Sequence, residues 1–221
     1  MPRPGRSATG EPGARRGPGA GLREQQKSRR RARLLAAGRT LFVEHGYAAT
    51  SMEAIAAAAE LGIATVYNYF GSKSKLLATI LKEDFAVLYR QADELVAAPP
   101  ADPCRGVLAL VELYRRFEGN WQAKGMLAAV LGPGLTADPA LDEVAREAEG
   151  RVRKQLAALL THYRQAGRIR REINIRDAAT VLFYVFNQHF IEYVTGQSTD
   201  FARMQAAMDR QLRFIVTAIS G

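Results

Sequence analysis

Two short helical segments joined by a three-residue turn lie within residues 50–70, and this feature constrains the fold most. The stretch "TSME" has the pattern of a capping box, in which Thr50 caps a helix and Glu53 reaches back to its backbone. The turn Glu60-Leu61-Gly62 separates this helix from the next one. A longer helix comes before both and is expected to end at His45-Gly46, because glycine suits the left-handed position after a helix. This order predicts a helix-turn-helix unit.

The second short helix, which includes "ATVYNYF" at residues 64–70, has an unusual outer side. Val66 and Phe70 are four residues apart, so they share the face that is expected to pack into the core. The opposite face carries small or polar side chains instead of the Glu and Lys of an ordinary surface helix. These outward residues are Ala64, Thr65 and Asn68, and Tyr67 and Tyr69 emerge on the two flanks, each about 80° from the core direction.

This arrangement suits the major groove of double-stranded DNA. Alanine and the threonine methyl can contact thymine methyl groups, while flanking phenols can donate hydrogen bonds to phosphates. Lys73 lies at the start of the following helix, where a backbone N-terminus and an ammonium together favour a phosphate contact. For Ile63, core packing and base reading are both open. The predicted DNA-binding residues are Ser51, Ile63, Ala64, Thr65, Tyr67, Asn68, Tyr69 and Lys73.

Positive charge is concentrated at the N-terminal end. Residues 1–33 contain ten of the 31 basic residues and two of the 22 acidic ones, while the remainder is nearly neutral. Residues 1–22 are rich in Gly and Pro and are predicted to form a disordered basic arm. Arg29 and Arg30, just beyond it, are candidate DNA contacts of this arm. The alternatives are a solvated tail and an anionic membrane surface, although the adjoining helix lacks an extended basic amphipathic design.

Residues 36–77 carry a dense pattern at fixed spacing: Phe42, Gly46-Tyr47, Thr50, Ile55-Ala56, and Thr65 to Phe70 followed by Lys73. With this pattern the segment resembles the TetR-type (tetracycline-repressor-like, TetR/AcrR) family of transcriptional regulators. Two positions depart from the family pattern, because Glu60 replaces the usual Gly of the turn and Gly62 replaces the usual Ser cap. Either Glu60 adopts the left-handed conformation, at about 1–2 kcal/mol, or the turn shifts so that Gly62 does. The matching residues are Phe42, Gly46, Tyr47, Thr50, Ile55, Ala56, Thr65, Val66, Tyr67, Tyr69, Phe70 and Lys73.

The resemblance implies an all-α fold with two parts. Residues 23–72 would form a three-helix DNA-binding domain, and residues 73–221 a larger helical domain for effector binding and dimerisation. The implied function is that of a cytoplasmic, homodimeric repressor that binds a palindromic operator and is released by a small molecule. The alternatives are a C-terminal domain that binds a protein partner instead, and a helical enzyme or carrier that kept the N-terminal shape.

Helix boundaries in the second part are marked by proline and glycine. Pro99-Pro100 is expected to end the helix that begins near Lys73, and Asp102-Pro103 to begin the next with a cap and a first-turn proline. "GPG" at residues 132–134 interrupts the chain, and Asp138-Pro139 opens a long helix. Two last helices are expected at about residues 177–195 and 199–219. No segment shows the alternation of a strand.

The penultimate helix is apolar around most of its circumference, so it must be buried on two sides. It is either a central core helix of a monomer or, as the resemblance implies, part of a homodimer interface made by the last two helices. Candidate interface residues are Val185, Phe186, Phe190, Phe201, Met204, Met208 and Ile215. The resemblance also implies an effector pocket, for which plain core packing is the alternative. Its candidate residues are Tyr114, Phe117, Trp121, Met126, Phe183 and Asn187.

Other classes of function lack support in the sequence. Cys104 is the single cysteine, which excludes an intrachain disulfide, and no nucleophile motif surrounds it. The three histidines are widely separated, so we expect no metal site. The sequence shows no convergent set of polar residues, so we expect no enzymatic activity, and no cofactor is expected. No apolar run is long enough for a membrane span, and no apolar signal segment is seen at the N-terminus.

Overall fold

The computed structural model describes residues 18–118, 138–194, 196 and 200–221. This part of the chain is helical, with no strand and one isolated bridge between Ile169 and Ser220. The predicted all-α class is therefore confirmed. The helices are α1 (Pro18–Ala49), α2 (Met52–Ala58), α3 (Ile63–Phe70), α4 (Lys73–Ala97), α5 (Pro103–Glu118), α7 (Pro139–Gln165), α8 (Ile175–Val194) and α9 (Phe201–Ile219).

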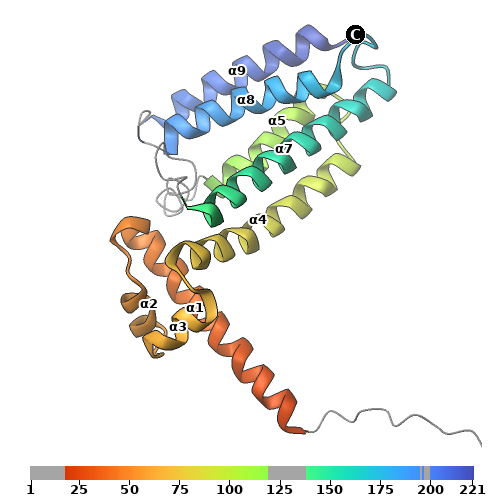
Figure 1. Cartoon of the computed structure of the whole chain (residues 1–221). Coiled ribbons are helices and arrows are strands. Elements are labelled where there is room, and N and C mark those ends of the chain that lie inside the picture. The colour runs from red at the N-terminus through yellow and green to blue at the C-terminus, as the bar shows by residue number, and fades with distance from the viewer. Residues whose placement is uncertain (1–17, 119–137, 195, 197–199) are drawn as a thin grey trace, which may run out of the picture.

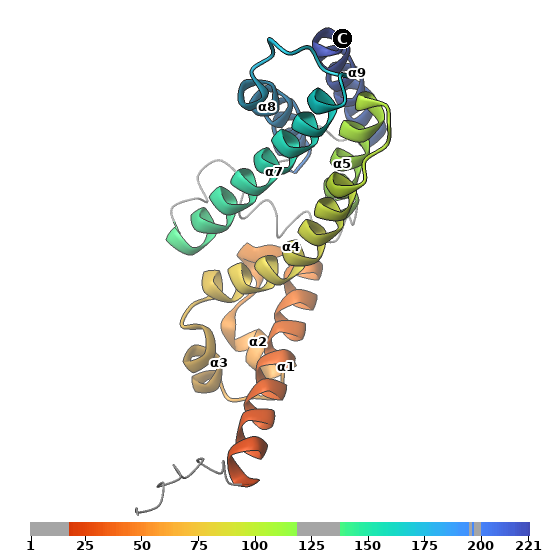
Figure 2. The same cartoon turned by 90° about the vertical axis from the view of Figure 1, so that its right-hand side faces the viewer.

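The helices gather at two ends of an elongated molecule (Figures 1 and 2). Helices α1, α2 and α3 lie at one end, α5, α7, α8 and α9 lie at the other, and α4 runs between them. Buried side chains form two apolar clusters, and α4 contributes to both. Its first turns supply Leu77 and Leu81 to the cluster that holds α1–α3, and its later turns supply Leu88 and Ala92 to the second. A displacement of α4 therefore affects both ends.

Buried apolar side chains and one close helix approach at a glycine hold the three-helix unit together and against α4. Val66 and Phe70 of α3 are buried, as their spacing predicts. On α1, Leu34 and Phe42 are fully buried, and Gly38 lies against α4. A Cβ atom at Gly38 would come within 2.6 Å of a Leu76 methyl carbon, so only glycine allows this approach of the two helices without displacing that side chain.

The start of α2 differs from the predicted capping box. Ser51, not Thr50, is the cap, and its Oγ accepts a hydrogen bond from the Ala54 N–H at 3.1 Å. Thr50 is buried, and its hydroxyl lies 2.8 Å from the Gly46 carbonyl and 3.1 Å from the Leu41 carbonyl. Gly46 has a non-helical φ of 79° and kinks α1 at the predicted helix end, although a short helical piece continues to Ala49. The Thr50 hydroxyl therefore donates to carbonyl groups of α1, and Ser51 is the N-cap of α2 instead.

The turn between α2 and α3 keeps the left-handed residue at Glu60, which has a φ of 49°. Gly62 has a φ of −69° and begins α3 without a side-chain cap, so the alternative in which Gly62 takes the positive φ is wrong. The Glu60 carboxylate also forms an ion pair with Arg33 of α1 at 2.7 Å.

Helix α1 begins at Pro18, earlier than the predicted end of the arm at residue 22. Proline is well tolerated at the first helical position because its missing N–H would have no partner there. Residues 18–22 are thus helical, while the prediction of disorder for residues 1–17 lies outside the described residues.

The predicted helix starts in the larger part are confirmed. Asp102 accepts a hydrogen bond from the Arg105 N–H at 2.7 Å at the start of α5. Asp138 accepts one from the Ala140 N–H at 2.9 Å at the start of α7, with proline at the first position. Helix α4 ends at Ala97, just before the two prolines. The glycine-rich break at residues 132–134 lies outside the described residues.

Candidate DNA-binding surface

The exposed face of α3 is centred closer to Tyr67 than the sequence predicted. Ala64 and Asn68 are exposed, as predicted, and Tyr67 retains 47% of its accessible surface. Ile63, at 37%, is also exposed, which favours a surface role over a core role. Thr65 is only half-exposed, so less of its side chain is accessible to a DNA base than the helical geometry alone indicated.

Tyr69 is engaged inside the protein. Its hydroxyl donates a hydrogen bond to the Lys27 carbonyl of α1 at 3.1 Å. A phenol has one O–H, so Tyr69 cannot donate to a phosphate while this bond exists. The two flanking phenols therefore differ, because Tyr67 has no such acceptor among the described residues.

Lys73 also has protein partners. Its Nζ donates to the carbonyls of Tyr47 and Thr50 at 2.8 Å each and lies 3.5 Å from that of Ala48. The ammonium also lies 4.4 Å from the centre of the Tyr47 ring, and burial lowers the pKa of Lys73. The three donors of a lysine are thus directed at the last turn of α1 and at Thr50, and the predicted phosphate contact has no free donor here.

Ser51 differs from Lys73 because its hydroxyl hydrogen remains available. The Oγ atom accepts from Ala54, and the exposed O–H can still donate outward. Ser51 lies at the N-terminus of α2, where backbone N–H groups favour an anion. It therefore remains a predicted phosphate contact.

The basic residues of α1 fall into two groups. Arg31 pairs with Glu83 at 3.0 Å and Arg33 pairs with Glu60 at 2.7 Å. Arg39 pairs with Asp84 at 2.6 Å. The other Lys and Arg residues from position 21 onward are exposed and form no ion pair with a carboxylate of the described residues; they are Arg23, Lys27, Arg29 and Arg30.

The candidate effector residues are only partly within the described chain. Tyr114 and Phe183 are buried in the same apolar cluster, and Asn187 is half-buried. The Tyr114 hydroxyl donates to the side-chain oxygen of Gln155, which is itself buried. Burial raises the pKa of this tyrosine well above its ordinary value. Trp121, Met126 and the side chain of Phe117 lie outside the described residues.

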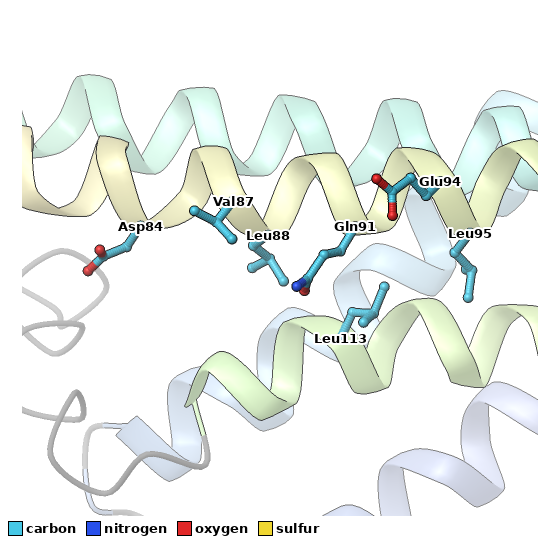
Figure 3. A pocket seen from close by; sticks show the side chains of 7 residues that line it. All are labelled: Asp84, Val87, Leu88, Gln91, Glu94, Leu95 and Leu113. Atoms are coloured by element: carbon cyan, nitrogen blue, oxygen red, sulfur yellow. The ribbon is translucent and has the colours of Figure 1, made fainter.

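A groove of about 820 Å³ lies between α4 and α5 (Figure 3). Tyr114, Phe183 and Asn187, the predicted pocket residues whose side chains the structure describes, do not line it. The α4 side is mainly one helical stripe with a spacing of three or four residues, which is a signal that sequence reading could have used. The lining residues are Asp84, Val87, Leu88, Gln91, Glu94, Leu95 and Leu113.

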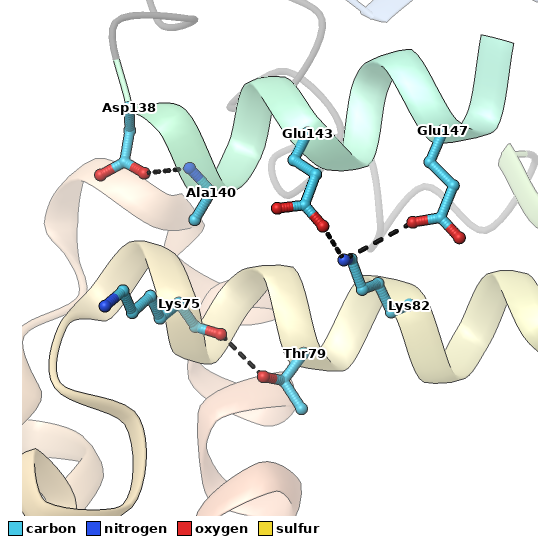
Figure 4. A network of polar contacts seen from close by, with 7 residues as sticks. All are labelled: Lys75, Thr79, Lys82, Asp138, Ala140, Glu143 and Glu147. Atoms are coloured by element: carbon cyan, nitrogen blue, oxygen red, sulfur yellow. Dashed lines mark hydrogen bonds and ion pairs between the residues drawn. The ribbon is translucent and has the colours of Figure 1, made fainter. Parts of the chain in front are cut away.

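Ion pairs connect α4 to the helices on both sides of it. Lys82 contacts Glu143 at 2.6 Å and Glu147 at 3.5 Å, both on α7 (Figure 4). On the other side, Asp84 contacts Arg39 of α1 at 2.6 Å. Asp84 therefore belongs both to the groove and to the contact with the three-helix unit.

Helices α8 and α9 carry large exposed apolar residues. Val181 retains 48%, Tyr184 56% and Phe214 76% of their accessible surface. The sequence-based interface candidates lie elsewhere, since Phe186, Phe190, Met204 and Met208 are buried within the protomer and Val185, Phe201 and Ile215 are half-buried. Both faces of α8 are apolar, so the sequence did not indicate which face meets a partner, and an interface role for these residues stays a prediction.

In the described ranges, no group of His, Cys, Asp and Glu has the proximity needed to hold a metal ion. None of the helices in the described part is both long and apolar enough for a membrane span.

The three-helix unit, its capped α2 and its exposed α3 define a helix-turn-helix protein. Residues 34–80 match the model of a family described as bacterial regulatory proteins, tetR family. This match covers the three-helix unit and the start of α4, so this part of the chain is similar to the TetR type of transcriptional regulators.

Known relatives agree with this assignment. The repressor NicS from Pseudomonas putida is 33% identical over 91 residues, which are 41% of this chain and 42% of NicS. The chain thus matches less than half the length of that relative.

Two solved structures share the fold over most of their length. A TetR-family regulator from Pectobacterium atrosepticum has a TM-score of 0.69 and 20% identity, covering 90% of this chain and 96% of its own. FadR from Bacillus subtilis, solved in complex with stearoyl-CoA, has a TM-score of 0.67 and 17% identity, covering 85% of this chain and 98% of its own.

Proposed function

We propose that the protein is a homodimeric transcriptional repressor that binds a palindromic operator and leaves it when a small molecule binds. The observation that carries this proposal is the exposed side of α3, where Ala64, Tyr67 and Asn68 project from a three-helix unit. Small and polar side chains on a short helix can reach base edges in the major groove. Because its target is chromosomal DNA, we place its action in the cytoplasm.

The exposed apolar residues of α8 and α9 support dimerisation. Tyr184 and Phe214 are exposed on two helices that contact each other, and contiguous exposed apolar surface marks interaction sites. A two-fold symmetric partner would cover them and would hold two recognition helices about one DNA turn apart. We therefore assign the interface to Val181, Tyr184 and Phe214 in place of the inward-facing residues.

The groove between α4 and α5 supports control by a small molecule. Its volume of about 820 Å³ lies within the range of ligand pockets, about 300–1,000 Å³. The known structure of FadR with stearoyl-CoA is a precedent for a ligand-bound member of this fold. Four apolar residues together with Asp84, Gln91 and Glu94 make the groove amphipathic. An open groove also suits the alternative, in which a protein segment replaces the small molecule.

Asp84 couples the groove to the contact between α4 and the DNA-binding unit. It lines the groove and pairs with Arg39 of α1, so an occupant that displaces this carboxylate also disturbs the α1–α4 contact. A ligand changes DNA affinity only if it binds the two arrangements of α4 with different affinity.

A footprint on the DNA that flanks the protein's own gene is the direct test. We expect a protected palindrome, and we expect Asn68→Ala to change base preference within each half-site by about 1–3 kcal/mol. Glu53→Ala, an exposed substitution on α2, is the matched control for a change near the surface. Sedimentation should give twice the chain mass for the wild type and a monomer for Phe214→Glu. A monomeric wild type, or binding without any sequence preference, contradicts the proposal.

A further inference from the structure

Helix α1 continues past the three-helix unit, away from the larger part of the molecule (Figure 1). Every residue from 21 to 33 is exposed, so packing against the core does not explain this extension. Buried contacts begin only at Leu34. A helix exposed on all sides is usually stabilised by side-chain pairs or by a partner.

The core-facing stripe of α1 changes from apolar to basic where the helix leaves the core. Leu34, Gly38 and Phe42 are buried and follow one another in steps of four residues. Continued toward the N-terminus in steps of three or four, the same stripe contains Arg30, Lys27 and Arg23. We define these three residues as the basic stripe.

The basic stripe lies beside the recognition helix. The Tyr69 hydroxyl of α3 donates to the Lys27 carbonyl, which fixes α3 against this part of α1. Arg31 and Arg33 are neutralised by Glu83 and Glu60. The three stripe residues have no such carboxylate among the described residues, so their charge is available to an external anion.

We propose that the basic stripe of Arg23, Lys27 and Arg30 is a rigid, helical second site for the phosphate backbone, adjacent to the sequence read by α3. This inference rests on the proposed DNA-binding function and adds a partner contact to it. Arg29 lies two positions from Lys27, about 200° around the helix, and is not part of the site. A membrane surface is a poorer partner because Leu22 is the large apolar side chain exposed on this stretch, and one such residue makes no apolar face.

The stripe contributes charge contacts that do not depend on sequence, so a mixed-sequence DNA duplex is a suitable probe. The test variant combines Arg23→Gln, Lys27→Gln and Arg30→Gln. The control removes the same charge far from the DNA-binding end. It combines Arg168→Gln, Arg171→Gln and Arg176→Gln, all exposed at the connection of α7 and α8 or the start of α8.

Affinity for the duplex is measured over a range of KCl concentrations. Six cations per dimer, at about 0.9 of slope for each phosphate contact, predict that the log–log salt slope falls by about five units. The control should change it by less than about one unit. Equal slopes for the test and control variants would overturn the proposal. A test variant that loses binding to anionic phosphatidylserine vesicles but keeps its DNA slope would overturn it as well.

Ser28→Pro separates a rigid helix from a flexible basic tail, because it breaks the helix between the stripe residues without changing charge. We expect it to lower the slope toward that of the test variant, while Ser28→Ala does not. A slope unchanged by proline would refute the helical site. Sequence preference on the footprinted fragment is measured in parallel. If that preference is present while the slopes are unchanged, this inference fails and the proposed function stands.

Discussion

Lys73→Met tests whether this lysine holds the fold or contacts DNA. Methionine keeps the length of the side chain but removes the ammonium that binds the Tyr47 and Thr50 carbonyls at 2.8 Å. Hydrogen bonds from a charged donor contribute about 1.5–3 kcal/mol each when shielded, and these are only partly shielded from water. The lost contact with the Tyr47 ring, 4.4 Å away, adds about 0.5–1 kcal/mol. We expect a loss of about 2–4 kcal/mol in the free energy of unfolding.

Urea unfolding at neutral pH, followed by circular dichroism, measures this loss. Lys75→Met is the matched control, because Lys75 is exposed on the first turn of α4. The control should change the unfolding free energy by less than about 0.5 kcal/mol. If Lys73→Met leaves stability unchanged but lowers the salt slope of DNA binding by about two units per dimer, the lysine is a phosphate contact and the structural assignment is wrong.

Gly106→Ala should destabilise the protein by about 1–3 kcal/mol, because a Cβ atom there would lie 1.8 Å from the Tyr163 hydroxyl oxygen. Gly150→Ala should instead stabilise α7 by up to about 1 kcal/mol, because no atom lies within 4 Å of a Cβ there. Thermal melts of the two variants check these signs, and equal shifts would refute the packing argument. Asp138→Ala should cost about 1 kcal/mol at pH 7 through loss of the α7 cap. A hydrogen bond from Ser74 lowers the pKa of Asp138, so the stability lost in Asp138→Ala should stay constant down to pH 3.8, the ordinary pKa of an aspartate, and shrink below that pH. Urea titrations of both proteins at pH 7, 5 and 3 measure this difference in unfolding free energy. A difference that is the same at all three pH values would contradict the capping role.

Local sequence determined the helices, their ends and the position of the recognition helix. The spacing of Val66 and Phe70 predicted the buried side of α3, and the Asp-Pro pairs predicted the starts of α5 and α7. These features depend on contacts within about four residues, which a helical period and a cap encode directly. The left-handed Gly46 is of the same kind.

Partners far apart in the chain were not predictable in this way. The sequence places Lys73 at a helix start and gives no sign of a protein partner, yet the carbonyl groups that accept its hydrogen bonds lie 23 to 26 positions earlier. Tyr69 reads as an outward phenol, yet its acceptor is 42 positions away on α1. Thr50 lost its capping role because the returning chain placed it on the carbonyls of α1.

The same limit applies to surfaces formed by two helices. The composition of α8 showed that both its sides had to be covered, but both sides are apolar, so only packing against α7 and α9 determined that Phe186 points inward and Tyr184 outward. The groove exists because α4 and α5 diverge in space around Leu113 and Gln91. Periodicity and capping are properties of one helix, whereas a groove, a buried face or a long-range acceptor depends on the relative positions of several helices, which the tertiary structure alone determines.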